Sequence, residues 1–257
     1  MLFRSTTASE RLPRGVVVDR RVPVPMRDGT VLRADVYRPD DSARHPVLLE
    51  HVCYEPVNRG AWNGAFYASR GYAVVIQSVR GTFGSEGAFE PFQHDAWGAD
   101  RDGHDGVEWA AAQPWSNGRV GMLDGSFSGF TQYLTAPTRP RHLVALSPRQ
   151  AGGDVYHDFV YRDGTYGLFY LDWAMRTVHS HLLAERPTDP ARRAAQSRLK
   201  AALDELDKWH WHLPLSSCPP LEGIADWYFE HVAHPEFGRY WWPTSLSLVA
   251  EEVDVPI

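Results

Sequence analysis

Residues 119–130 read Arg-Val-Gly-Met-Leu-Asp-Gly-Ser-Phe-Ser-Gly-Phe and join a short apolar run, a glycine-containing turn and a serine. The run Val120–Leu123 lies between turn residues, which is typical of a strand buried on both faces of a parallel sheet. Gly125 and Gly129 allow a sharp bend and close packing of the next helix. We therefore predict a strand, a turn that exposes the Ser126 hydroxyl, and a helix whose positive end faces that hydroxyl.

The spacing of the glycines departs from the usual nucleophile turn, in which the serine is the middle residue of Gly-x-Ser-x-Gly. Here Phe127 is midway between Gly125 and Gly129, and Asp124 lies two positions before Ser126, where a small residue is usual. Serine- and glycine-rich turns of this kind also have purely structural roles. From these residues alone, a catalytic and a structural interpretation of Ser126 both stay open.

Strand and helix patterns alternate along the first 154 residues. The expected strands are 16–26, 31–37, 46–51, 72–77, 120–123 and 143–146, and the expected helices are 66–70, a segment from about 100 to before Pro114, and the segment after Ser126. The Asp28-Gly29 turn is predicted to join the first two strands as a hairpin. This order predicts an α/β fold with an open, mostly parallel sheet.

The pattern changes after residue 154. Residues 155–243 show no convincing strand, and 191–209 form an amphipathic pattern with Asp189 as N-cap and Pro190 at the first helical position. We predict that 155–243 is a helical cap inserted over the edge of the sheet. Residues 244–257 are predicted to return to the core, with 253–257 opening a new buried strand at which the chain stops.

Composition limits the partners and the compartment. The chain has 257 residues, 43% of them hydrophobic, and a net charge of -6, which fits a globular protein without a nucleic-acid partner. There is no run of about eighteen apolar residues for a membrane span, and no apolar segment follows residues 1–6 as in a secretory signal. Cys53 and Cys218 lie far apart without metal-ligand spacing. We expect a cytoplasmic protein with no cofactor, no metal and no membrane partner.

Two loops invite other functional interpretations. Residues 80–87 are glycine-rich, but they lack the Gly-Lys-Ser/Thr ending of a phosphate loop, so tight backbone packing near a site is the preferred interpretation. Residues 100–105 carry three carboxylates without the closing Glu of a calcium loop. Acidic residues at the positive end of a helix explain that segment better.

Four blocks, in order, carry a more specific pattern. They are 27–39 (Arg-Asp-Gly-Thr-Val-Leu-Arg-Ala-Asp-Val-Tyr-Arg-Pro), 46–50 followed by Tyr54, 71–75 followed by the glycine-rich loop 80–87, and 108–122, which leads into the turn at Ser126. Together they resemble the family of α/β-hydrolases that includes bacterial cocaine esterase and X-prolyl dipeptidyl aminopeptidase. The resemblance is strong over 16–150 and weak over the cap. It implies an α/β-hydrolase sheet, incomplete at its C-terminal side, with a helical cap.

The resemblance also implies roles for three residues. Ser126, in a pattern that closes on Gly129, would be the nucleophile of a serine hydrolase that cleaves a small ester, an amide or a short peptide through an acyl-enzyme. The Tyr54 hydroxyl and the Phe127 backbone N–H would stabilise the oxyanion. Asp124 stands where the family usually has Gly, so its carboxylate is expected to crowd the turn and oppose the developing negative charge. The family's catalytic acid and base lie downstream and are expected beyond Ile257.

A serine nucleophile needs a base and a group that orients the base. Nothing in the sequence brings a histidine to Ser126. The candidates are His51, His94, His104, His157, His179, His181, His210, His212, His231 and His234. Two alternatives to an active hydrolase therefore stay open. One is an inactive, truncated fragment whose incomplete sheet edge promotes self-association. The other is a non-catalytic binding protein that uses the cap tryptophans Trp209, Trp211, Trp227, Trp241 and Trp242.

Overall fold

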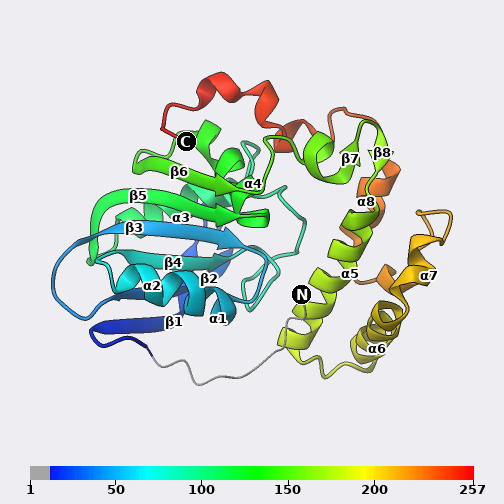
Figure 1. Ribbon diagram of the computed structural model, residues 1–257, viewed down its shortest axis with the longest axis horizontal. Helices are drawn as coiled ribbons and strands as arrows, with labels where there is room; N and C mark the ends of the chain where they lie inside the picture. The colour runs from blue at the N-terminus through cyan, green and yellow to red at the C-terminus, as the bar shows by residue number, and fades with distance from the viewer. Residues whose placement is uncertain (1–11) are drawn as a thin grey trace.

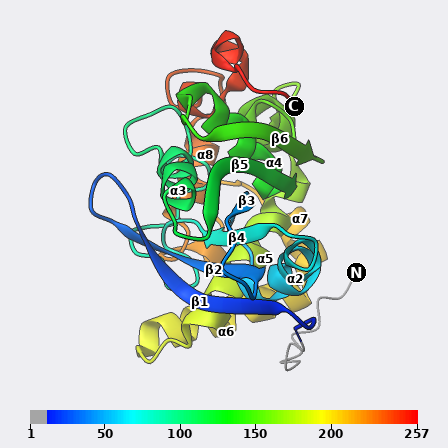
Figure 2. The ribbon, with the colours of Figure 1, turned by 90° about the vertical axis from the view of Figure 1, so that its left-hand side faces the viewer.

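A mostly parallel sheet forms the centre of the protein (Figures 1 and 2). The computed structural model describes residues 12–257, and within them this sheet has the strand order β1-β2-β4-β3-β5-β6. Its strands are β1 (Val16–Pro25), β2 (Val31–Pro39), β3 (His45–Val52), β4 (Ala73–Ser78), β5 (Ser116–Gly125) and β6 (Leu143–Arg149). β1 and β2 form the predicted antiparallel hairpin, and β3 to β6 run parallel to one another. This confirms the predicted α/β class.

Helices cover both faces of the sheet and bury the apolar strands. On one face, α1 (Pro56–Arg59) and α2 (Ala65–Ala68) contact β2 and β4. On the other face, α3 (Asp102–Ala111) and α4 (Phe127–Thr135) contact each other and β5. Every residue of β4 is buried, as expected of a central strand covered on both sides.

A helical cap lies beside the sheet (Figure 1). It contains α5 (Leu168–Glu185), α6 (Pro190–Asp204), α7 (Leu206–His210) and α8 (Asp226–Ala233). The predicted N-cap is present, because the Asp189 carboxylate accepts a hydrogen bond from the Arg192 backbone N–H at 2.9 Å. The single helix expected over 191–209 is instead two helices, because Glu205 has φ -121° and ψ 37° and interrupts the helix between α6 and α7.

The second half of the chain differs from the sequence-based prediction in a short hairpin of the cap and in the last five residues. Residues 155–243 were expected to lack strands, but a short hairpin pairs β7 (Tyr161–Arg162) with β8 (Thr165–Tyr166). Residues 253–257 do not form the expected buried strand. They follow a series of 3-10 turns and contact the outer side of β6 through a hydrogen bond from the Leu146 N–H to the Pro256 carbonyl. Val253 and Val255 still pack against the apolar core of the sheet, although the segment itself is irregular.

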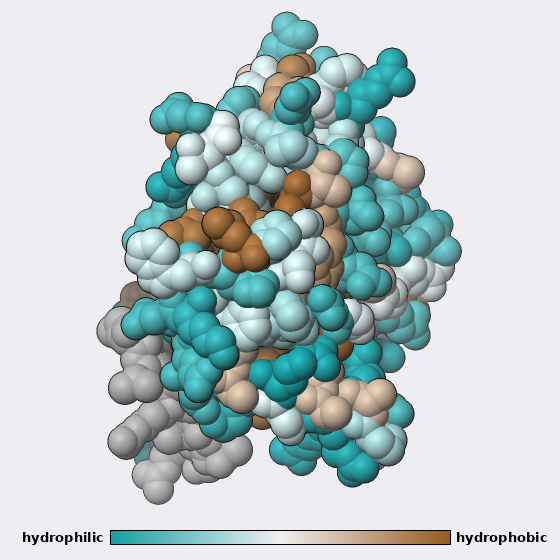
Figure 3. Space-filling view, turned by 90° about the vertical axis from the view of Figure 1, so that its right-hand side faces the viewer, coloured by the Kyte–Doolittle hydropathy of each residue, from teal (hydrophilic) through white to brown (hydrophobic). Residues whose placement is uncertain are grey.

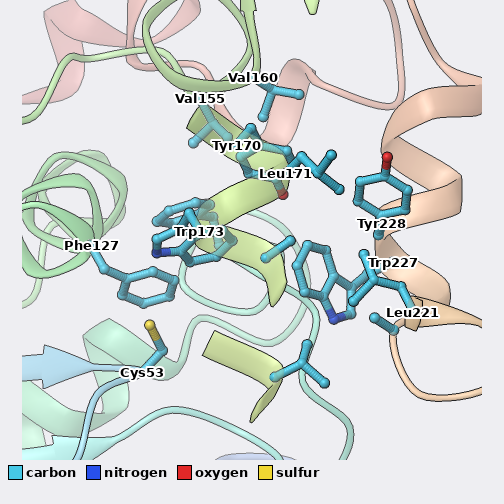
Figure 4. Close-up of a cluster of buried hydrophobic side chains, with 14 of the residues drawn as sticks. Cys53, Phe127, Val155, Val160, Tyr170, Leu171, Trp173, Leu221, Trp227 and Tyr228 are labelled. Atoms are coloured by element: carbon cyan, nitrogen blue, oxygen red, sulfur yellow. The ribbon is translucent and has the colours of Figure 1, made fainter. Parts of the chain in front are cut away.

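The cap and the sheet share an apolar core (Figure 4). Cys53 and Phe127 reach it from the sheet side, and Tyr170, Trp173 and Trp227 reach it from the cap. The cap is therefore packed onto the carboxyl end of the sheet, where Ser126 lies. The face of the molecule shown in Figure 3, on the side of the cap, is mostly hydrophilic and carries groups of apolar side chains between polar ones.

Among the described residues 12–257, no helix is both long and apolar enough to cross a bilayer. The same residues contain no group of three or more His, Cys, Asp or Glu side chains arranged to hold a metal ion. The segment used to argue against a secretory signal, residues 1–6, lies outside the part of the chain that the structure describes.

Candidate active site

Ser126 lies on the sharp turn between β5 and α4. Its backbone has φ 58° and ψ -128°, a region that non-glycine residues rarely occupy. The Ser126 N–H donates to the Arg149 carbonyl at 2.9 Å, and the Ser126 carbonyl accepts from the N–H groups of Gly129 and Phe130. These bonds fix the turn from both sides. The side chain itself is half-buried rather than enclosed in the core.

Tyr54 follows the end of β3 and faces the serine. Its hydroxyl oxygen lies 3.2 Å from Ser126 Oγ, and it accepts a hydrogen bond from Trp173 Nε1 at 3.0 Å. Burial raises the pKa of Tyr54 to about 12. The phenol is therefore neutral at physiological pH and keeps a proton that it can donate.

Phe127 is the first residue of α4, where backbone N–H groups have no partner within the helix. Its side chain is buried and stacks on Phe92, with ring centroids 4.3 Å apart. The Tyr54 ring meets the Phe127 ring edge-on at 6.4 Å. The structure thus brings together the three residues that the sequence singled out, Ser126, Tyr54 and Phe127.

Asp124 lies in the turn just before Ser126, and its carboxylate is paired with two arginines. Its backbone has φ 87°, a conformation that favours glycine. Its carboxylate pairs with the guanidinium groups of Arg59 and Arg149 and accepts a hydrogen bond from Asn63 Nδ2 at 3.0 Å. The two cations offset the negative charge that was expected to oppose attack by Ser126.

Glu50 is a buried charged residue that the sequence analysis did not single out. It lies on β3, accepts hydrogen bonds from Asn63 Nδ2 at 3.0 Å and Ser128 Oγ at 3.3 Å, and pairs with Arg59. Burial raises the pKa of Glu50 to about 7, with Arg59 opposing the rise and Asp124 adding to it. One acidic residue within the apolar run of β3 was the available signal, because an unpaired carboxylate is rarely buried.

The glycine-rich loop 80–87 is held by ion pairs. Arg80 forms two hydrogen bonds with Asp102, at 2.6 and 2.8 Å, and a third with Asp28 at 2.7 Å. A Cβ on Gly81 would lie 2.3 Å from the Phe89 backbone nitrogen. These contacts show the tight backbone packing that was preferred over a phosphate site.

Six of the histidines within residues 12–257 bond groups other than Ser126. Within residues 12–257, the hydrogen bond recorded for Ser126 Oγ is the one with Tyr54. His51 faces Asp95 at 2.9 Å, His181 bonds the Cys53 carbonyl, and His231 bonds the Tyr170 hydroxyl. His94, His104 and His142 pair with Asp100, Thr138 and Glu108. These contacts assign no general base among the described residues.

A mostly parallel sheet between helical layers, a serine on the turn from β5 to α4 and a helical cap define an α/β-hydrolase fold. Residues 28–257 match the X-Pro dipeptidyl-peptidase (S15) family, and the chain belongs to this family.

Curated relatives are considerably longer than this chain. The chain is 33% identical over 239 residues to cocaine esterase from Rhodococcus sp. (strain MB1 Bresler), a match that covers 89% of this chain and 41% of the relative. It is 27% identical over 228 residues to a putative serine esterase from Mycobacterium bovis, covering 79% of this chain and 33% of the relative. The chain therefore spans less than half the length of these relatives.

Solved structures share the fold. A CocE/NonD family hydrolase from Staphylococcus aureus aligns with a TM-score of 0.66 at 22% identity, over 94% of this chain and 40% of that protein. An α-amino acid ester hydrolase aligns with a TM-score of 0.64 at 20% identity, over 97% of this chain and 42% of that protein. At these identities the likeness establishes the fold.

Proposed function

We propose that this chain carries the nucleophile of a serine hydrolase that cleaves ester or amide bonds through an acyl-enzyme. Ser126 is the nucleophile in this proposal. The observation that carries it is the half-buried Ser126, on a turn of positive φ at the start of α4, with its Oγ 3.2 Å from the neutral Tyr54 hydroxyl. Membership of a peptidase family with esterase relatives favours a hydrolase over a non-catalytic binding protein.

Each residue has a defined role in the proposed reaction. Ser126 Oγ bonds to the substrate carbonyl carbon while a general base takes the hydroxyl proton. Negative charge develops on the carbonyl oxygen, where the Tyr54 O–H and the Phe127 N–H donate hydrogen bonds. A single such donor lowers the barrier by about 3–4 kcal/mol. The leaving alcohol or amine departs with a proton, and water then hydrolyses the acyl-enzyme.

The general base and its orienting acid are proposed to follow Ile257 in a longer protein. Two observations support this. Six histidine side chains within residues 12–257 bond groups other than Ser126 Oγ, namely His51, His94, His104, His142, His181 and His231. The relatives named as esterases are more than twice as long as the segment that matches this chain.

The proposed substrate is a small ester, an amide or a short peptide. This class follows from the family, described as X-Pro dipeptidyl-peptidases, and from the relative named cocaine esterase.

Hydrolysis of p-nitrophenyl acetate by the native full-length gene product tests the proposal. Ser126→Ala is expected to reduce kcat by at least about 10³-fold, as loss of a serine nucleophile does in other serine hydrolases. Ser128→Ala is the matched control, because Ser128 lies in the same turn but bonds Glu50 instead of Tyr54. Equal rates for the native protein and Ser126→Ala would overturn the assignment.

A further inference from the structure

Helix α5 of the cap hydrogen-bonds the segment that carries Tyr54. Trp173 Nε1 donates to the Tyr54 hydroxyl oxygen at 3.0 Å. Two turns further along α5, His181 Nε2 lies 2.8 Å from the Cys53 carbonyl oxygen. A carbonyl can only accept, so this nitrogen of His181 carries a proton, and burial lowers the pKa of His181 to about 4, which keeps the ring neutral. The cap is therefore bonded to the backbone and the side chain of two consecutive residues.

The bond from Trp173 determines which way the Tyr54 hydroxyl points. An indole N–H can only donate, so the phenol oxygen must be the acceptor in this pair. The phenolic proton prefers the plane of its ring, and the Trp173 N–H disfavours the orientation directed at itself. Ser126 Oγ, 3.2 Å away, is the other recorded partner of this hydroxyl. The Tyr54 proton is therefore directed to the side on which Ser126 reacts.

Packing holds the Trp173 indole rigidly. Its side chain is buried and stacks on Tyr170 at 5.3 Å with an interplanar angle of 23°. On the other side it lies nearly parallel to Phe127, at 6.3 Å and 14°. Figure 4 shows the indole between these two residues. A ring fixed in this way loses little entropy when its N–H forms a hydrogen bond, and it also contacts the residue whose backbone N–H is the second proposed oxyanion donor.

We propose that Trp173 is a positioning residue of the oxyanion site, whose indole N–H fixes the Tyr54 hydroxyl as a donor toward the Ser126 reaction centre. This inference rests on the proposed function, because it assigns Tyr54 the role of oxyanion donor. It makes the cap part of the catalytic apparatus, since displacement of α5 would release the phenolic proton to rotate. Donation into the phenol also polarises its O–H bond and strengthens the hydrogen bond that it gives.

A spectroscopic experiment tests the hydrogen bond whether or not the protein is active. The ¹H–¹⁵N indole resonance of Trp173 is assigned by its loss in Trp173→Phe, which keeps an aromatic ring but removes the N–H. Tyr54→Phe is expected to shift this resonance. The indole of Trp241 is the control, because it belongs to the same core and donates to the His234 carbonyl at 2.8 Å instead. An unchanged Trp173 resonance in Tyr54→Phe would overturn the inference.

A kinetic cycle on the native protein tests the positioning role. Trp173→Phe is expected to lower kcat for p-nitrophenyl acetate about tenfold, the effect of one ordinary hydrogen bond, and to leave KM nearly unchanged. In the Tyr54→Phe background the same substitution should have little further effect, whereas Trp241→Phe should have the same effect in both backgrounds. Equal losses from Trp173→Phe in both backgrounds would contradict the positioning role. If Ser126→Ala matched the native rate, the proposed function would fail and the indole resonance would still decide whether Trp173 positions Tyr54.

Discussion

Two non-glycine residues of the turn, Asp124 and Ser126, hold backbone conformations that favour glycine, with φ of 87° and 58°. Each such residue costs roughly 1–3 kcal/mol and persists because its surroundings determine it. Arg59 and Arg149 hold the Asp124 carboxylate, and the Arg149 carbonyl holds the Ser126 N–H. At the scale of single residues, the candidate site is thus a strained turn stabilised by neighbouring charges and hydrogen bonds.

Removal of the Tyr54 hydroxyl tests its proposed role as oxyanion donor. Tyr54→Phe keeps the ring and its contact with Phe127 but removes the O–H group. Because the donor acts on charge that develops in the transition state, kcat is expected to fall about 10²- to 10³-fold with little change in KM. Steady-state kinetics with p-nitrophenyl acetate measures both constants. A change confined to KM would show that Tyr54 binds substrate without stabilising the oxyanion.

The buried carboxyl of Glu50 makes stability depend on pH. Its folded pKa of about 7 exceeds its value of 4.5 in the unfolded chain, so the folded state binds more protons between these values. Protonated Glu50 therefore contributes to the free energy of unfolding fully below pH 4.5. This contribution, about 3 kcal/mol at most, is lost as the pH rises through 7. Glu50→Gln does not ionise, so its stability relative to the native protein should increase from pH 5 to pH 8.

Urea unfolding of both proteins across this pH range measures the difference in free energy of unfolding. Glu236→Gln, on the surface, is the control for loss of a carboxylate. A constant difference between Glu50→Gln and the native protein from pH 5 to pH 8 would show that Glu50 stays ionised throughout, held by Arg59.

At the scale of elements, the close approach of α4 to β6 positions the serine. A Cβ on Gly129 would lie 2.6 Å from the Ala151 Cβ and 2.9 Å from the Arg149 carbonyl oxygen. Both neighbours belong to the end of β6 and the segment after it, so neither can move without displacing the strand. Gly129 therefore allows the first turn of α4 to pack against the backbone that also holds the Ser126 N–H.

Gly129→Ala is expected to destabilise the fold by about 1–3 kcal/mol, the usual effect of overpacking a well-filled site. Gly98→Ala is the matched control, because a Cβ on Gly98 would meet nothing within 4 Å. Denaturant unfolding of the two variants measures the change. Equal stability of Gly129→Ala and Gly98→Ala would mean that α4 can shift away from β6 freely.

The sequence predicted the sheet well because its buried strands are short apolar runs between turn residues, as in β3, β4 and β5. The helix α5 was not singled out because its sequence does not show one apolar face. Leu168 and Phe169 are exposed, whereas Thr177 and His181 are buried. The break at Glu205 and the irregular path of 253–257 depend on tertiary contacts, which local periodicity does not report.

The residues of the candidate site could be predicted from the sequence only in part, for a similar reason. Ser126, Tyr54 and Phe127 followed from a family resemblance carried by local motifs. Trp173 contacts Tyr54 across 119 residues of sequence, and the ion pairs that surround Glu50 and Asp124 join three separate segments. Partners that only the fold brings together leave no signal in a single sequence.

At the scale of the whole molecule, β6 is an outer strand of the sheet. The segment 253–257 contacts it through the Leu146–Pro256 hydrogen bond without forming a strand beside it. An outer strand offers backbone donors and acceptors to another chain. Apolar side chains are also exposed on the cap, among them Trp211 at 87% and Leu213 at 77%. We propose that this 257-residue chain self-associates through the β6 edge.

Sedimentation velocity over a range of protein concentrations tests this prediction. The chain is expected to form dimers or larger species, and Ser147→Lys, at an exposed position of β6, should weaken them because an edge lysine disfavours strand pairing. Ser216→Lys, at an exposed position of the cap, is the control for added charge. A monomer at every concentration, or a larger effect of Ser216→Lys, would contradict association through β6.

Labelling of the native protein with a fluorophosphonate determines whether the Ser126 hydroxyl is the nucleophile. Mass spectrometry of the digested protein should find the adduct on the peptide that contains Ser126, with strongly reduced labelling in Tyr54→Phe and none at that peptide in Ser126→Ala. An adduct at a different residue, with equal labelling of the native protein and Ser126→Ala, would show that Ser126 is not the nucleophile.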